Sequence, residues 1–374
     1  MKAYPRIVLA GAIALAGVLP LAACRHRPAE SALPVAAATQ YGGAIADTRA
    51  YAARLFDSLA LPGLAIAVSV NDQVVMTAEF GYADVESRAP ITPTSQFRIG
   101  SVSKLLTSAA SVRLVQQKKL DLDAPIGRYL PTLPPDKHPI TTRQLAAHLA
   151  GLRHYGPGEF SSQVRYESVA AGLRIFLQDT LLTPPGTRQF YSSYGFNLLA
   201  AVMEAASGQE YRELIRGEVT RPLGMTHTMV EASLAPGQSP VGFYVKKQGV
   251  LARADRVDLS DRWPSGGFLS TSVDLARFGA GILRSSYLSD AMRTELFTSQ
   301  KLADGTATRV GLAWRVATDS AGRRFVHHGG EAMGGRAFLL VYPEHRVVVV
   351  MLANQSFAAF RENEAGRIAR MFLR

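Results

Sequence analysis

Strand-like apolar runs occupy both ends of this 374-residue chain, and its long middle part has a different character. Residues 64–83 read LAIAVSVNDQVVMTAEFGYA, two runs rich in β-forming residues that meet at Asn71-Asp72, which is typical of a hairpin. Four further runs follow from residue 310 onward, namely VGLAWRV, RRFVHHG, AFLLVYP and RVVVVMLAN. The pattern predicts one antiparallel sheet whose strands come from both ends of the chain.

The middle of the chain, residues 105–283, consists of helical segments broken by Pro and Gly, as in LPTLPPDKHP and LTPPGTRQF. Helices are also predicted over residues 47–59 and over the last fifteen or so residues, FRENEAGRIARMFLR. Residues 44–374 contain no internal repeat or second linker, so they are interpreted as one domain. The expected class is α+β, an antiparallel sheet flanked by N- and C-terminal helices with a helical subdomain inserted.

The N-terminus has the layout of an export signal. Lys2 and Arg6 precede an apolar stretch that ends in Leu-Ala-Ala before Cys24. This ending resembles the lipobox of bacterial lipoproteins, in which the cysteine is lipidated and becomes the mature N-terminus. We therefore expect a lipoprotein signal peptide over residues 1–23 and a Pro- and Ala-rich tether over residues 24–43.

Cys24 is the only cysteine, so the chain can form no intramolecular disulfide. Lipidation there would hold the protein at the periplasmic side of a bacterial membrane. Arg25 follows, where an aspartate would signal inner-membrane retention in enteric bacteria, so the outer membrane is favoured. An uncleaved apolar anchor is the alternative, and it also places the domain outside the cytoplasm and next to a membrane.

The net charge is +11, yet basic residues do not alternate with aromatic ones in any run. A nucleic-acid partner is therefore not expected. The charge would favour an anionic surface or an acidic polymer such as a cell wall, because long-range attraction raises local concentration without specifying a partner. A general abundance of arginine explains the charge equally well. The oligomeric state is left open.

Ser101 and Lys104 form the only S-x-x-K sequence in the chain. The residues around them have apolar side chains at helical spacing, so the hydroxyl and the amine are expected one turn apart on the same helix face. A serine becomes a nucleophile when a neighbouring base removes its proton, and lysine can be that base when burial or a nearby cation lowers its pKa. A solvated helix face is the alternative interpretation, and the apolar surroundings of Lys104 argue against it.

The surrounding sequence resembles a known family. FRIGSVSKLLTSAASVRLVQQKKLDLDAPIGRYLP, PPGTRQFYSSYGFNLLAAVMEAASG and SGGFLSTSVDLARFG are similar to segments of class C β-lactamase-like and penicillin-binding-protein-like serine hydrolases. The resemblance covers residues 64–356 and is closest to the mitochondrial β-lactamase-like serine protease and its bacterial relatives. It implies a β-lactamase/transpeptidase-like fold with Ser101 as nucleophile and Lys104 as base.

The resemblance also implies a second motif, Tyr-x-Asn, which matches Tyr191-Ser192-Ser193. Tyr191 is then the general acid and base beside the lysine, and Ser193 replaces the asparagine. Tyr194 is the alternative tyrosine if the register is shifted.

The third motif of the family, Lys-Thr-Gly or His-x-Gly, matches His327-His328-Gly329. Adjacent strand residues face opposite sides, so only one histidine can point at the site, and the family pattern favours His327. The same match assigns Gly329 to the motif and the backbone N–H of Gly330 to the oxyanion site, paired with that of Ser101. No third ligand accompanies the two histidines at metal-binding spacing, so no metal and no cofactor are expected.

These features predict a serine hydrolase that cleaves amides or esters of peptide, ester or cell-wall-derived substrates through an acyl-enzyme. Ser193 and His327 replace the asparagine and lysine that bind β-lactams, so a peptidase or esterase is favoured over an efficient β-lactamase. A β-lactamase or D,D-carboxypeptidase, and a non-catalytic peptidoglycan-binding or self-assembling lipoprotein, are the alternatives. His148, His154 and His227 are interpreted as structural.

Overall fold

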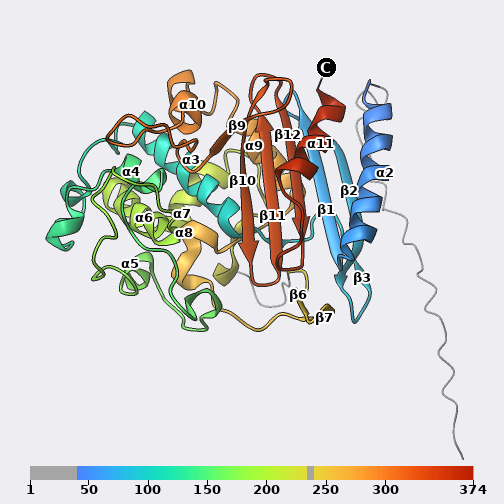
Figure 1. The fold of residues 1–374 in the computed structure, drawn as a ribbon, viewed down its shortest axis with the longest axis horizontal. Helices are drawn as coiled ribbons and strands as arrows, with labels where there is room; N and C mark the ends of the chain where they lie inside the picture. Colours follow the sequence, from blue (N-terminus) through green and yellow to red (C-terminus); the bar gives the residue numbers. More distant parts are fainter. Residues whose placement is uncertain (1–39, 234–239, 374) are drawn as a thin grey trace, which may run out of the picture.

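A seven-stranded antiparallel sheet in the order β3-β2-β1-β12-β11-β10-β9 forms the centre of the computed structural model, which describes residues 40–233 and 240–373 (Figure 1). Its strands are β1 (Gly63–Val70), β2 (Gln73–Asp84), β3 (Ala89–Pro90), β9 (Arg315–Thr318), β10 (Arg324–Ala332), β11 (Gly335–Tyr342) and β12 (Val347–Ala353). The strand from the C-terminal end, β12, pairs with β1 along its length, so both ends of the chain build one sheet as predicted. The α+β class is confirmed.

Helices α2 (Gly42–Leu59) and α11 (Glu362–Phe372) cover one face of the sheet and contact each other (Figure 1). One apolar core lies between these helices and the sheet. Helix α2 begins at Gly42, two residues before the expected start of the domain at residue 44. The predicted signal peptide and most of the predicted tether, Cys24 included, lie outside the described residues.

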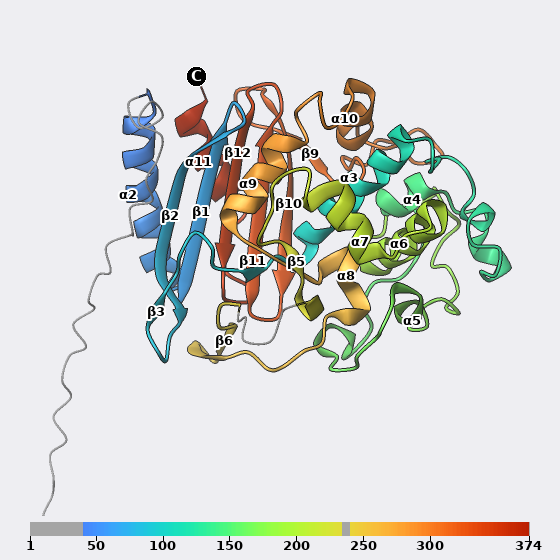
Figure 2. The ribbon, with the colours of Figure 1, turned by 180° about the vertical axis from the view of Figure 1, so that it is seen from behind.

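The opposite face of the sheet is covered by α9 and continues into a helical subdomain (Figure 2). A second, larger apolar core joins the two parts. The helices on this side are α3 (Ser103–Gln116), α4 (Thr142–Ala146), α5 (Val169–Leu173), α6 (Ser193–Ser207), α7 (Tyr211–Ile215), α8 (Trp263–Gly266), α9 (Ser272–Gly281) and α10 (Asp290–Phe297). Helix α3 lies within this core, and its residues from Ser103 to Val112 are all buried.

Two small sheets complete the fold. One has the order β4-β8-β5, with β4 at Phe97–Arg98, β8 at Phe268–Ser270 and β5 at Met229–Val230, and the other pairs β6 (Tyr244–Lys247) with β7 (Val250–Arg253). Strand β4 leads directly into the segment that carries Ser101. Among the described residues, no helix has both the length and the apolar character needed to cross a membrane.

Two details of the sheet show why local patterns succeed or fail. Asn71 and Asp72 both have positive φ, 47° and 68°, as a tight hairpin turn requires, so the predicted hairpin is confirmed. The run VGLAWRV was expected to be a strand, but β9 begins only at Arg315. The residues before it form a turn closed by a hydrogen bond from Gly311 N–H to the Trp314 carbonyl group. The Trp314 ring lies in the larger apolar core, between the sheet and the helical subdomain.

Candidate active site

Ser101 lies in a single 3₁₀ turn, η1 (Gly100–Val102), that leads into α3. Its side chain is partly exposed, whereas its neighbours Gly100 and Val102 are buried. Gly100 has a φ of +48°, and a Cβ at this position would lie 2.4 Å from the carbonyl oxygen of Glu331. Glycine is therefore required here, because the turn that presents Ser101 passes directly against β10.

Lys104 lies one turn after Ser101, as predicted, and is completely buried. Its Nζ is 3.1 Å from Ser101 Oγ, 3.1 Å from Ser193 Oγ and 2.7 Å from the Ser265 carbonyl oxygen. Burial holds the pKa of this lysine well below its ordinary value, and the positive charge of Arg262 lowers the pKa further. A lysine in this environment can be the neutral amine that accepts a proton from the serine hydroxyl.

Tyr191 contacts the other side of the nucleophile, since its hydroxyl donates a hydrogen bond of 2.7 Å to Ser101 Oγ. Burial raises the pKa of this phenol, although the hydrogen bond to Ser101 acts in the opposite direction. Tyr191 therefore keeps its proton at neutral pH and can donate it to a leaving group. The alternative, Tyr194, belongs to α6, donates to Glu159 and stacks on Phe176, so it does not reach Ser101.

Ser193, the residue in place of the family asparagine, is 1% exposed and contacts Lys104 rather than open space. Ser192 before it caps α6 through a hydrogen bond from the Gly195 N–H to its hydroxyl. The site is thus assembled from two helix starts, the first turn before α3 and the first turn of α6.

Two histidines hold the segment that carries Tyr191 and Ser193. The Nδ1 atoms of His148 and His154 accept hydrogen bonds of 3.2 Å from the N–H groups of Ser192 and Ser193, respectively. The His148 ring also lies 4.3 Å from the Tyr191 ring. Burial, with the charge of Lys104, lowers the pKa of both imidazoles, to about 4 for His154, so both are neutral acceptors at pH 7. They were interpreted as structural, and the structure places them in direct support of the site.

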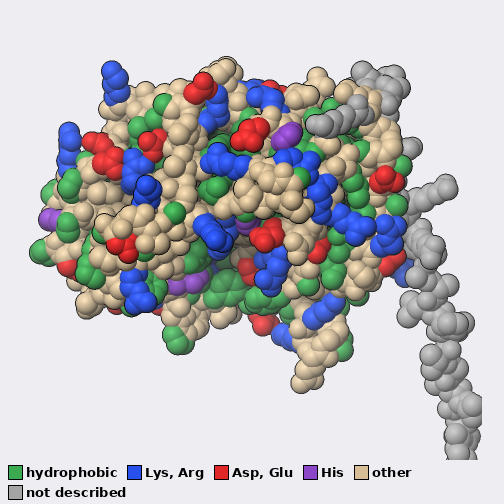
Figure 3. All heavy atoms as spheres, turned by 45° about the horizontal axis from the view of Figure 1, so that its top comes forward, with side chains coloured by type: hydrophobic (Ala, Val, Ile, Leu, Met, Phe, Trp, Pro, Cys, Tyr) green, Lys and Arg blue, Asp and Glu red, His purple; other side chains and the backbone are tan. Residues whose placement is uncertain are grey.

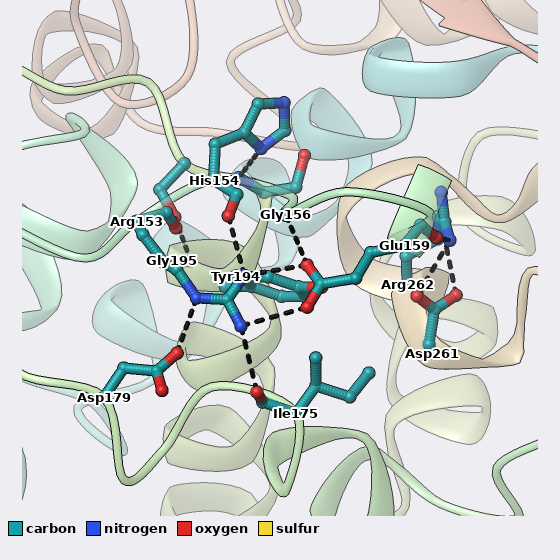
Figure 4. Close-up of polar contacts among 12 residues, drawn as sticks. Arg153, His154, Gly156, Glu159, Ile175, Asp179, Tyr194, Gly195, Asp261 and Arg262 are labelled. Carbon is teal, nitrogen blue, oxygen red and sulfur yellow. Dashed lines mark hydrogen bonds and ion pairs between the residues drawn. The ribbon is translucent and has the colours of Figure 1, made fainter. Parts of the chain in front are cut away.

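The loop that contains His154 is fixed by a network around Arg153 and Glu159 (Figure 4). The Arg153 guanidinium pairs with Glu159 and with Asp179, and Glu159 also accepts hydrogen bonds from Gly156 N–H and Tyr194. The carbonyl group of Arg153 accepts a hydrogen bond of 2.6 Å from Ser192 Oγ. The network therefore connects the loop to the start of α6, next to Lys104.

Arg262 and Asp261 form a buried ion pair behind the same loop, and their side chains are 3% and 1% exposed (Figure 4). Arg262 also donates to the carbonyl groups of Glu159 and Phe160, and it precedes α8, whose Ser265 carbonyl binds Lys104. Sequence patterns did not predict this pair. No spacing rule identifies a charge that acts through space on a lysine far away in the sequence.

The two histidines of β10 face opposite sides, and the structure reverses their predicted roles. His328 lies on the side of the helical subdomain, with its ring 6.2 Å from that of Tyr191. His327, which was predicted to face the site, stacks on Phe338 and lies 3.6 Å from the carboxylate of Glu362 in α11. Burial, together with the charge of Arg315, lowers the pKa of His327 to about 4, so it is uncharged at neutral pH.

Strand β10 passes close to the nucleophile at Gly330. A Cβ there would lie 1.9 Å from the Ile99 carbonyl oxygen and 3.2 Å from the Ser101 nitrogen. Any side chain at residue 330 would displace the turn that presents Ser101. Gly329, one residue earlier, lines the cleft.

The hydrogen-bond pattern of β10 changes the predicted oxyanion donor. Ala332 and Gly335 pair across a two-residue turn, and the pair that closes such a hairpin is hydrogen-bonded. Alternation along the strand then directs the amide of Gly330 to β11 and that of Glu331 away from it. A Cβ added at Gly100 would lie 2.6 Å from Glu331 N, so the amide of Glu331 borders η1. The donor paired with Ser101 N–H is therefore assigned to Glu331 rather than Gly330.

A cleft of about 420 Å³ opens over Ser101 and is lined by Tyr191, Ser193, both β10 histidines and several arginines. Arg315, at the start of β9, is exposed, and its guanidinium has no hydrogen-bond or acidic partner within residues 40–233 and 240–373. Figure 3 shows a face on which Lys and Arg side chains outnumber Asp and Glu side chains, in keeping with the net charge of +11. In those same ranges, no three His, Cys, Asp or Glu side chains are grouped as a metal site would need.

Comparisons with known proteins bear on the family and the fold of this chain. The sequence profile of the Beta-lactamase family matches residues 48–370. The mitochondrial serine beta-lactamase-like protein of Homo sapiens is 28% identical, over 81% of this chain and 73% of its own length. Penicillin-binding protein 4* of Bacillus subtilis is 25% identical, over 74% of this chain and 64% of its own. The octameric penicillin-binding protein homologue from Pyrococcus abyssi has the same fold, with a TM-score of 0.74, 24% identity and coverage of 88% and 76%.

Proposed function

Because this chain belongs to the beta-lactamase family of serine hydrolases, we propose that it hydrolyses amide or ester bonds through an acyl-enzyme on Ser101. One observation carries the proposal: Ser101 Oγ lies between the buried amine of Lys104, at 3.1 Å, and the hydroxyl of Tyr191, at 2.7 Å. The first is a base and the second an acid, because burial lowers the pKa of the lysine and raises that of the tyrosine.

Acylation follows from this geometry. Lys104 accepts the Ser101 proton as Oγ forms a bond to the substrate carbonyl carbon, and the negative charge that develops on the oxygen is bound by the N–H groups of Ser101 and Glu331. Tyr191 donates its proton to the leaving nitrogen or oxygen as that bond breaks. The Lys104 ammonium, 4.9 Å from the centre of the Tyr191 ring, returns the proton to the phenolate. Water then hydrolyses the acyl-enzyme by the reverse sequence.

The substrate class follows from groups that this cleft lacks. A β-lactamase of the family uses an asparagine amide and a lysine charge to bind its substrate. Here Ser193 is bound to Lys104, and His328, the histidine on the side of Tyr191, is kept neutral because burial lowers its pKa. Short acyl esters and peptide amides require neither group. We therefore propose a peptidase or esterase, with β-lactam or D,D-peptide hydrolysis as a weaker activity.

A covalent serine-directed phosphonate tests the nucleophile. Mass spectrometry should locate the adduct on Ser101, and the Ser101→Ala protein should remain unlabelled. Equal labelling of Ser101→Ala would contradict the assignment. A folded protein that no serine-directed probe labels would instead support the non-catalytic peptidoglycan-binding alternative.

Substrate preference is a separate measurement. The values of kcat/KM for p-nitrophenyl acyl esters and peptide anilides should exceed that for a chromogenic cephalosporin. A cephalosporin preferred by orders of magnitude over every ester and anilide would show that Ser193 and His328 do not limit β-lactam binding.

We also propose that the protein is an exported lipoprotein held by Cys24, since the sole cysteine ends a lipobox-like stretch. Cys24→Ser should remove the protein from the detergent phase of membrane fractions, because stable anchoring needs more than one acyl chain and a lipoprotein cysteine carries several. Unchanged fractionation of a processed Cys24→Ser protein would contradict lipidation at this residue. Separation of inner and outer membranes tests the outer-membrane expectation.

A further inference from the structure

A second cavity, separate from the cleft over Ser101, lies beside α7 and the small sheet. Its volume is about 490 Å³, within the range of roughly 300–1,000 Å³ that is usual for small-molecule sites. Its apolar lining comes from α7, β5, β8 and the loop before β5, and the residues are Ile215, Met225, Met229, Val230 and Phe268. All of these except the half-buried Met229 are at most 3% exposed, so the cavity reaches the apolar core.

Three arginines border this apolar floor, and only one of them lacks an acidic partner. Arg212 pairs with Glu210, and Arg216 pairs with Glu213. Arg221 is exposed and makes no side-chain hydrogen bond or ion pair with any residue that the structure describes. The cavity therefore combines a mostly apolar interior with one positive charge at its edge, that of Arg221, which has no ion-pair partner among the described residues.

The backbone places this charge at the end of a π-helical turn, η5 (Arg216–Thr220). The turn is closed by a hydrogen bond of 3.1 Å from the Arg221 N–H to the Arg216 carbonyl group. Such turns are rare, and they occur frequently at functional sites. The irregularity is located where Arg221 meets the cavity.

We propose that this cavity binds a single acyl chain that ends in a carboxylate, as in a fatty acid. The chain would lie on the apolar floor, where each buried methylene contributes to affinity, and the carboxylate would pair with the Arg221 guanidinium at the edge. A neutral chain would lose the pairing with Arg221, and a short anion would lose the burial of methylenes. This inference does not rest on the activity proposed for Ser101.

The floor of the cavity also belongs to the framework of the catalytic turn. Phe268 N–H donates to Ser103 Oγ at 3.4 Å, and the Phe268 carbonyl group accepts from Ile99 N–H at 3.1 Å. A ligand against Phe268 therefore contacts a residue whose backbone holds both sides of Ser101. Occupancy is expected to change kcat for an ester substrate as well as to give a binding signal.

Titration calorimetry with sodium octanoate, decanoate and dodecanoate tests the proposal directly. Each ligand should bind with one-to-one stoichiometry, and Kd should fall about fourfold for each added methylene. Arg221→Gln should weaken dodecanoate binding about tenfold and leave dodecanol binding unchanged. Arg212→Gln is the matched control, because this arginine borders the same cavity and its partner Glu210 does not line it, so its effect should be small.

A second variant tests the location of the ligand. Met229→Trp fills the cavity at its half-buried edge, so it should weaken both dodecanoate and dodecanol, with an unchanged melting temperature as evidence of folding. Wild-type affinity for dodecanoate in both Arg221→Gln and Met229→Trp would overturn the proposal, as would dodecanol binding as tight as dodecanoate. Complete loss of dodecanoate binding when a phosphonate occupies Ser101, together with wild-type binding in Met229→Trp, would place the ligand in the catalytic cleft, which also overturns it.

Discussion

The two walls of the catalytic cleft differ in how firmly their polar groups are held. On the inner wall, Ser101, Lys104, Tyr191 and Ser193 are joined by hydrogen bonds of 2.7 to 3.1 Å, and Lys104 has no exposed surface. On the outer wall, formed by β9, β10 and α11, Arg315 is exposed, and its guanidinium has no partner among the described residues. The inner wall is therefore preorganised for catalysis, and the outer wall offers an unpaired side chain that can bind groups of the substrate.

The largest expected effect comes from the inner wall. Lys104→Met should lower kcat/KM for an ester by about 10⁴-fold or more, because Ser101 then has no base. Lys137→Met is the matched control. Lys137 is also buried, at 1% exposure, but its ammonium pairs with Asp136 and the residue does not line the cleft over Ser101. This control should lower the melting temperature and keep the rate. A similar rate loss in both variants would mean that burial of a lysine, and not its position, matters.

Tyr191→Phe should have the next largest effect, a decrease of roughly 10²–10⁴-fold in kcat with little change in substrate binding. The decrease should be greater for an anilide than for a p-nitrophenyl ester, whose leaving group needs no proton. Tyr194→Phe removes a hydroxyl that donates to Glu159 and should keep its activity. Equal losses for the anilide and the ester would contradict the role of Tyr191 as proton donor to the leaving group.

On the outer wall, Arg315→Gln should affect only substrates that carry an anionic group. For mono-p-nitrophenyl succinate, kcat/KM should fall about tenfold, as expected for loss of one charge-assisted contact at a partly exposed site. For p-nitrophenyl butyrate it should not change. Arg256→Gln removes an equal charge from an exposed position that does not line the cleft. Parallel losses with both substrates would show that Arg315 contributes to folding or to general attraction instead.

The double variant Asp261→Asn/Arg262→Gln removes both charges of the buried ion pair. Among these variants, it should change kcat least. Arg262 lowers the pKa of Lys104, so loss of its positive charge should raise that pKa. The acid limb of the kcat/KM profile, where Lys104 becomes protonated and inactive, should then move to higher pH. An acid limb that stays in place would assign the low pKa to burial alone.

The sequence was sufficient for the parts of the molecule that local patterns determine. Alternating apolar residues predicted the strands and their antiparallel sheet, and Asn71-Asp72 predicted a tight turn, because its two residues tolerate positive φ. Ser101 and Lys104 are three residues apart in one helical segment, so their contact follows from helix geometry alone.

Other features depend on how distant segments are placed. The choice between His327 and His328, and between the amides of Gly330 and Glu331, depends on the register of β10 against β11 and on the hairpin that sets it. The support that His148 gives to Tyr191, and the charge of Arg262 near Lys104, arise from loops that only the folded chain brings together. Neither a residue spacing nor a hydrophobic period contains that information.

The pairing of β1 with β12 has a consequence for the order in which the molecule can form. Leu64 pairs with Ala353, and β12 lies between β1 and β11, so the sheet lacks an internal strand until β12 has been synthesised. Contacts between such distant residues have a large loop-closure cost and fold slowly. A chain that lacks β12 therefore cannot complete this sheet, and truncation within β12 should yield a chain that does not fold rather than one that is merely shorter.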